Sequence, residues 1–199
     1  MDEVREQAER DYQLASGLSQ DVESHDNVFR QTTARLPWLL IGMLGGIGNS
    51  MILGNFDTTF AAHPEMALYI PLIGGTGGNV GTQSSALVVQ GLANSSLDSG
   101  NTFQQILKES VVALINATII SMLVYIYNFI RFGATATVSY SVSISLFAVV
   151  MFASIFGTLV PMTLEKLKID PAIATGPFIS ITNDIIGMMM YMGITVLLS

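Results

Sequence analysis

The chain has 199 residues, of which 50% are hydrophobic and only 12% charged, and its formal net charge is −7. A soluble domain carries about a quarter charged residues, and eight of the fifteen acids here precede residue 27, so this composition indicates an integral membrane protein. Nucleic acid is excluded as a partner because no basic patch could neutralise phosphate, and a sequence without cysteine excludes disulfides and thiol chemistry.

Residues 1–34 are polar and acidic, and they lack the basic stretch and apolar core of a signal peptide. We predict a cytosolic N-terminal segment here, either a solvated helix or the linker from a larger cytosolic part. Residues 35–199 are predicted to form one transmembrane domain.

The first membrane span is predicted over residues 36–56. Pro37 is expected in its first helical turn, where the missing N–H costs nothing. Gly42 and Gly46 have the spacing that allows another helix to approach closely.

The second predicted span, residues 66–92, has an unusual core that reads PLIGGTGGNVGTQSS over residues 71–85. Each glycine disfavours a helix in water by about 1 kcal/mol, and polar or irregular backbone is tolerated in a membrane only where it is buried in protein or lines a wet cavity. On a helix the polar side chains would form one stripe that includes Asn79 and Gln83. These residues either serve tight packing only or line a pore or binding site, and we favour the second interpretation.

Three further spans are predicted over residues 111–132, 138–164 and 171–198, with Asp170 capping the last helix and Pro171 in its first position. Five spans place the termini on opposite sides. With this topology, seven Lys and Arg residues lie on the same side of the membrane as the N-terminus, and one, Arg131, lies on the opposite side. Lys and Arg favour the cytoplasmic side. We therefore predict a multi-pass protein of the cell membrane with its N-terminus in the cytoplasm and its C-terminus outside.

Asp184 is the one carboxylate within the apolar run from Ile173 to Leu198. An acid at membrane depth costs several kcal/mol unless it faces water, a partner or an ion. On a helix it shares a face with Gly176, Ser180, Gly187 and Tyr191. We favour a cation site over a carboxyl group that only joins helices and over a proton relay, which usually has several acids or histidines in series.

The oxygen ligands around Asp184 favour a hard cation, Mg²⁺, Ca²⁺ or Mn²⁺, over Zn²⁺ or Cu. One carboxylate per chain is few for a divalent ion, and a symmetric dimer would bring two together. Because Mg²⁺ sheds water reluctantly, a wide site that binds the hydrated ion needs few direct ligands.

Two motifs in the same chain resemble the MgtE family of magnesium channels. The first is the glycine-rich run from Pro71 to Ser84, and the second extends from Asp170 to Gly187 and includes Thr182-Asn183-Asp184. The resemblance covers residues 35–199, the transmembrane domain of the family. Family members usually also carry a cytosolic helical domain and paired CBS domains, to whose connecting helix residues 1–34 would correspond at most.

The resemblance implies a homodimer with five spans per subunit and a pore between the subunits, lined by the second and fifth helices. The selectivity carboxylate of the family falls on Asp184. The accompanying pore-facing positions fall on Gly75, Gly78, Thr82 and Ser180.

Together these observations predict an all-α membrane homodimer that conducts Mg²⁺ into the cytoplasm down its electrochemical gradient. Asp184 would concentrate the hydrated ion, and its water shell would be contacted by Gly75, Gly78, Asn79, Thr82 and Ser180. A transporter coupled to Na⁺ or H⁺ and a non-transporting membrane scaffold remain alternatives. An enzyme is not expected, because the spans contain no Ser–His pair or His–Glu metal motif.

Overall fold

The computed structural model describes residues 9–10, 12–19, 22–94, 97, 102–133, 137–174 and 176–198. Within these residues the chain forms helices and no strand, which confirms the predicted all-α class. The elements that follow the N-terminal segment are, in chain order, α2 (Val28–Gly54), α3 (Asp57–Ala62), η1 (Pro64–Tyr69), α4 (Ile70–Ala93), α5 (Thr102–Phe132), α6 (Thr137–Lys166), η3 (Pro171–Ala174) and α7 (Gly176–Leu198).

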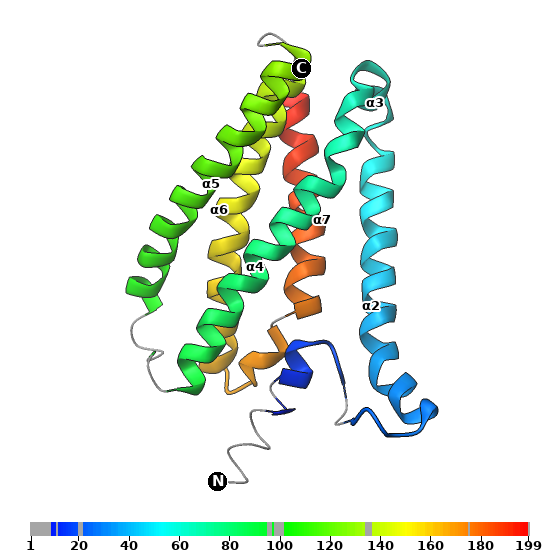
Figure 1. The fold of residues 1–199 in the computed structure, drawn as a ribbon, viewed down its shortest axis with the longest axis vertical. Helices are drawn as coiled ribbons and strands as arrows, with labels where there is room; N and C mark the ends of the chain where they lie inside the picture. The colour runs from blue at the N-terminus through cyan, green and yellow to red at the C-terminus, as the bar shows by residue number, and fades with distance from the viewer. Residues whose placement is uncertain are drawn as a thin grey trace.

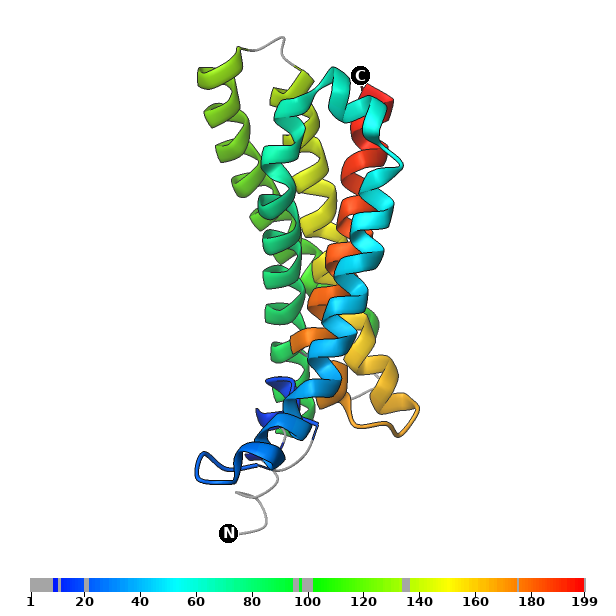
Figure 2. The ribbon, with the colours of Figure 1, turned by 90° about the vertical axis from the view of Figure 1, so that its right-hand side faces the viewer.

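Four of these helices, α2, α5, α6 and α7, are long and apolar enough to cross a membrane. Together with α4 they run along the long axis of the molecule (Figure 1 and Figure 2). α4 has 24 residues and a length of roughly 36 Å at 1.5 Å per residue. α4 is an uninterrupted helix despite its glycines. Because glycine and amide side chains have low hydropathy, α4 is not apolar enough to be counted with the other four helices. The fifth span therefore stays a prediction.

α6 occupies the centre of the bundle, where it packs against α4, α5 and α7. Of its most apolar stretch 56% is buried, against 11% for α5 and 0% for α2. Val149 of α6, Ile73 of α4 and Met188 of α7 belong to one core cluster that also includes Met66 and Tyr69 of η1. The exposed apolar side chains of α2 and α5 suit contact with lipid acyl chains.

α2 packs mainly on α7, and glycine makes this contact possible. A Cβ atom at Gly45 would collide with the Ile181 side chain, and one at Gly42 would lie 3.8 Å from Ile181 Cδ1. Gly46 has nothing within 4 Å of the same position. The face of α2 toward α7 therefore carries Gly42 and Gly45, and a close helix contact at Gly46 stays a prediction.

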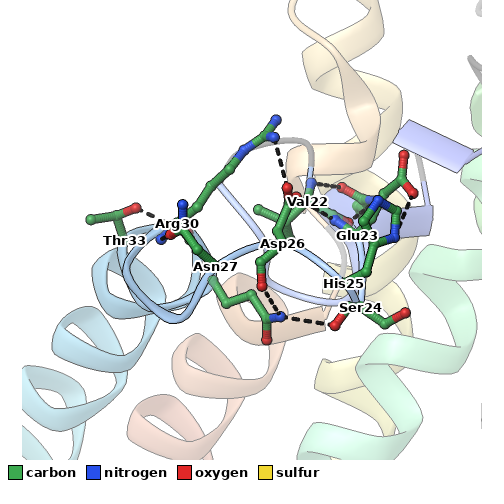
Figure 3. Close-up of polar contacts among 10 residues, drawn as sticks. Val22, Glu23, Ser24, His25, Asp26, Asn27, Arg30 and Thr33 are labelled. Carbon is green, nitrogen blue, oxygen red and sulfur yellow. Dashed lines mark hydrogen bonds and ion pairs between the residues drawn. The ribbon is translucent and has the colours of Figure 1, made fainter.

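The start of α2 is fixed by a polar loop that Figure 3 shows in close-up. Asn27 Oδ1 caps the helix by accepting from Arg30 N at 2.9 Å, and Asp26 Oδ2 accepts from Glu23 N at 2.8 Å. Arg30 Nη1 and Asp26 Oδ1 form an ion pair of 2.9 Å. The prediction that Pro37 occupies the first turn is wrong, because this cap starts the helix at Val28 and leaves Pro37 inside it.

The predicted boundary at residue 34 lies within the continuous helix α2. Residues 1–8, 11, 20 and 21 of the predicted N-terminal segment lie outside the described residues. The division of the chain into residues 1–34 and 35–199 stays a prediction.

Residues 12–19 lie against the start of α7. A Cβ atom at Gly17 would be 2.7 Å from Pro177 Cγ, and Ser19 Oγ donates to Ala34 O at 2.8 Å. Gly176 has a φ of 47° and contacts the backbone of Ala15, a close approach that a side chain at this position would obstruct.

The prediction that Asp170 and Pro171 begin the last long helix is wrong. Asp170 Oδ1 accepts from Ala172 N at 2.9 Å and so caps the short helix η3. α7 starts separately at Gly176, where the positive φ separates the two elements.

Candidate functional site

The central feature of the site is a pair of glycines on α4 that faces a carboxylate and a hydroxyl on α7. A Cβ atom at Gly74 would lie 3.3 Å from Asp184 Oδ1. A Cβ atom at Gly78 would lie 2.9 Å from Ser180 Oγ and 3.6 Å from Asp184 Oδ1. Both pairs are four residues apart in sequence, so they occupy one face of each helix. The missing side chains on α4 give Asp184 and Ser180 their space.

Asp184 is partly buried and lies roughly 12 Å along α7 from Gly176 and roughly 21 Å from Leu198. In the part of the chain that the structure describes, no hydrogen bond or ion pair involves its carboxylate. Its oxygens are not among the fully enclosed polar atoms without a partner, so they reach a surface of the chain. The carboxylate is thus available to a cation.

The remaining predicted positions on α4 lie beside this contact rather than within it. Gly75 and Asn79 are on an exposed face of α4, and a Cβ atom at Gly75 would meet nothing within 4 Å. Thr82 is partly buried, and its Oγ1 donates to Gly78 O and Asn79 O at 3.0 Å. A single chain therefore brings together Asp184, Ser180 and Gly78, whereas Gly75 and Asn79 face away from its core.

The predicted polar face of α7 divides in the structure. Gly187 lies against Val149 of α6, with 3.4 Å between its hypothetical Cβ and Val149 Cγ1. Tyr191 is fully buried and donates from its hydroxyl to Met66 O at 2.8 Å. Tyr191 therefore serves packing: although its spacing places it on the same face of the helix as Asp184, it belongs to the buried core cluster together with Met66 and Tyr69 of η1.

Gly74 was absent from the residues predicted for the site. The sequence does contain a signal for Gly74: Ser180 and Asp184 are four residues apart on one helix, and Gly74 and Gly78 have the same spacing on the other. Asn183, the neighbour of Asp184, is a second residue that is not among those predicted for the site. Its amide is 1% exposed, and neither its oxygen nor its nitrogen has a hydrogen-bond partner among the described residues.

Within the described residues no three His, Cys, Asp or Glu side chains gather closely enough to hold a metal ion. One chain therefore offers a carboxylate, a hydroxyl and backbone groups rather than a closed cage of ligands. Such a set suits an ion that keeps most of its own water.

The fold and the site define an all-helical integral membrane protein with an unpaired carboxylate set against a glycine face of a neighbouring helix. A family model described as "MgtE: Divalent cation transporter" matches residues 70–194, which include both faces of this contact. The chain belongs to the MgtE family, as its motifs predict, and this membership agrees with the prediction that it is not an enzyme.

Similarity to curated members of the family extends over nearly the whole chain. It is 31% identical over 194 residues to the magnesium transporter MgtE of Bacillus subtilis, a match that covers 98% of this chain and 43% of that protein. The magnesium transporter MgtE of Enterococcus faecalis is 29% identical over 195 residues, covering 98% and 42%. That of Thermus thermophilus is 33% identical over 165 residues, covering 83% and 36%. The chain thus spans less than half the length of these relatives.

Proposed function

We propose that this chain forms a channel through which hydrated Mg²⁺ enters the cytoplasm down its electrochemical gradient. The observation that carries the proposal is Asp184, an unpaired carboxylate in the middle part of an apolar helix, set against Gly74 and Gly78, which place no side chain of α4 beside it. A charge in such a position attracts a cation and costs several kcal/mol when it has none. The relatives named as magnesium transporters make Mg²⁺ the first ion to test.

A homodimer would complete the site. One carboxylate and one hydroxyl per chain leave most of the coordination to water, and a two-fold axis near α7 would place a second Asp184 opposite the first. The exposed face of α4, which carries Gly75 and Asn79, would then line the path instead of contacting lipid. In this arrangement the small residues set the width of the path, and the oxygens of Asn79, Thr82 and Ser180 accept from the water shell.

The proposed topology has five spans, with α4 crossing the cell membrane alongside the four more apolar helices. Its low hydropathy is acceptable because α6 and α7 cover one side of it and the wet path would cover another. Lys108 lies near the start of α5, and Lys166 and Lys168 lie at or just after the end of α6; these two helix ends are at the same end of the bundle as the start of α2 (Figure 1), whereas Arg131 lies at the other end of α5. The positive-inside rule then places the start of α2 in the cytoplasm and the C-terminus outside.

The test is Mg²⁺ flux into liposomes that contain the purified chain, with no Na⁺ or H⁺ gradient imposed. Replacing Asp184 by Asn keeps the shape of the side chain and removes its charge. Because a charge-assisted hydrogen bond contributes about 1.5–3 kcal/mol, we expect flux to fall by about 10- to 100-fold while the variant elutes like the wild type in size-exclusion chromatography. Asp57→Asn, at an exposed position on α3, is the matched control and should leave flux unchanged.

Unchanged flux in Asp184→Asn would refute the proposed role of this carboxylate. Flux that appears only when a Na⁺ or H⁺ gradient is imposed would instead support the coupled transporter. A wild-type chain that is folded and carries no ion under either condition would support the membrane scaffold.

A further inference from the structure

A second carboxylate, Glu109 on α5, is buried on the other side of α4. Its side chain is 7% exposed. Ser84 Oγ of α4 donates to Glu109 Oε1 at 2.6 Å, and Ser154 Oγ of α6 donates to the same oxygen. The two hydroxyls lie 3.0 Å apart. Glu109 thus joins three helices. It precedes the predicted span over residues 111–132 and is not among the residues predicted for a site.

Glu109 and both serines line a cavity of about 450 Å³ between α4 and α5, with α6 behind it. This volume exceeds that of a bare metal ion many times and has room for several waters, since each occupies about 30 Å³ in the liquid. The other polar side chains around it are amides and one amine: Gln83, Gln90, Asn94, Gln105, Asn116 and Lys108.

The hydrogen bonds leave part of the carboxylate for the cavity. Among the described residues both hydroxyls donate to Oε1, and the remaining exposure of Glu109 opens on the cavity that it lines. Lys108 lines the same cavity, yet no ion pair joins it to Glu109 in the described residues. Two hydroxyl hydrogen bonds alone do not balance a charge this deeply buried, and a cation would.

We propose that the Glu109 cavity is a second cation site, which binds a hydrated divalent ion within each subunit. All of the acceptors it offers are oxygens, from a carboxylate, two hydroxyls and amide groups, and a hard cation prefers this set. The volume favours an ion that keeps its water over a dehydrated Na⁺, because a bare ion would leave most of the cavity unfilled. The amides would then contact the water shell while Glu109 supplies the charge.

This site is separate from the contact of Asp184 with Gly74 and Gly78, because Ser84 leaves α4 toward α5 and α6 while the two glycines face α7. The proposal does not rest on the proposed channel activity, since binding is measured directly. An ion here would connect α4, which carries the glycine face, to both α5 and α6.

The experiment measures Mn²⁺ binding to the full chain in nanodiscs by electron paramagnetic resonance, with Mg²⁺ as competitor. Asp184→Asn serves as the background, so that the first site does not contribute. We expect this variant to retain one Mn²⁺ per chain that Mg²⁺ displaces, and the addition of Glu109→Gln to weaken that binding at least tenfold. Acids elsewhere in the chain, such as those of the N-terminal segment, are shared by both proteins and cancel in the comparison.

Equal Mn²⁺ binding with and without Glu109→Gln would overturn the proposal, as would the absence of Mg²⁺-displaceable binding in the Asp184→Asn background. If Glu109→Gln does not fold, Ser154→Ala in the same background tests the cation site instead, because it keeps the charge of Glu109 and removes one oxygen from the cavity. We expect it to weaken Mn²⁺ binding at least threefold, and unchanged affinity would overturn the site. Failure of this binding experiment leaves the flux result for Asp184 unaffected, so the two proposals can fail separately.

Discussion

The contact between α4 and α6 predicts that Gly157→Ala destabilises the fold. A Cβ atom at Gly157 would collide with the carbonyl oxygen of Gly81 and lie 3.1 Å from both Gly81 C and Gly81 Cα. Carbon atoms prefer about 3.5–4.0 Å, and backbone cannot rotate away as a side chain can, so the two helices must separate. Overpacking of this kind costs about 1–3 kcal/mol, and we take the upper end because the obstacle is backbone.

Alanine also favours a helix by about 1 kcal/mol relative to glycine, which leaves a net loss of about 2 kcal/mol. For a chain of this length we expect the midpoint of thermal unfolding in detergent to fall by about 4–8 °C. Gly48→Ala is the matched control, because a Cβ atom there meets nothing within 4 Å and alanine should be neutral or stabilising. If Gly157→Ala proves as stable as Gly48→Ala, a side chain at position 157 does not force α4 and α6 apart, and the reasoning is refuted.

Two further predictions concern the ends of the bundle. Tyr191→Phe removes the donor to the buried Met66 O, and we expect a loss of about 1–3 kcal/mol of unfolding free energy in the same thermal assay; an unchanged midpoint would show that this carbonyl finds another donor. At the start of α2, the backbone N–H of Glu23, together with the nearby Arg30, lowers the pKa of Asp26. The Asp26 loop is therefore stabilised above the ordinary aspartate pKa of about 3.9, and this stabilisation is lost as pH falls below it. The protection of the Glu23 amide against hydrogen exchange, taken relative to the intrinsic exchange rate at each pH, should therefore fall there. Asp26→Asn should remove this pH dependence of the protection, and a fall that persists in this variant would assign the effect to another group.

The sequence was sufficient to predict the helical class, the carboxylate in an apolar run and the cluster of glycines, because each of these signals is local and visible without a fold. That Asp184 meets the glycine-rich helix was implied only by the resemblance to the MgtE family. The rotation of α4 about its axis could not be predicted, because small residues occupy nearly every side of it. Only packing against α7 selects Gly74 and Gly78 for the contact and leaves Gly75 exposed.

Glu109 was missed for a related reason. It lies near the polar start of α5, next to Lys108, where an acid would ordinarily be exposed to water. Its burial is produced by Ser84 and Ser154, which come from helices distant in sequence. The position of Pro37 depends likewise on a cap ten residues upstream, and a proline signal alone favours the first turn.

The dependence of α2 on α7 has a consequence for biosynthesis. Among the long helices that the structure describes, α2 is synthesised before the others, yet its main packing partner, α7, is synthesised after them. At about 5–20 residues per second, α2 must wait on the order of ten seconds for the helix that carries Ile181. During that interval its glycine face is exposed to lipid or to the insertion machinery, so the bundle closes only after α7 has been synthesised. Chains that stop before α7 would leave α2 without its main partner and should be recognised by quality control.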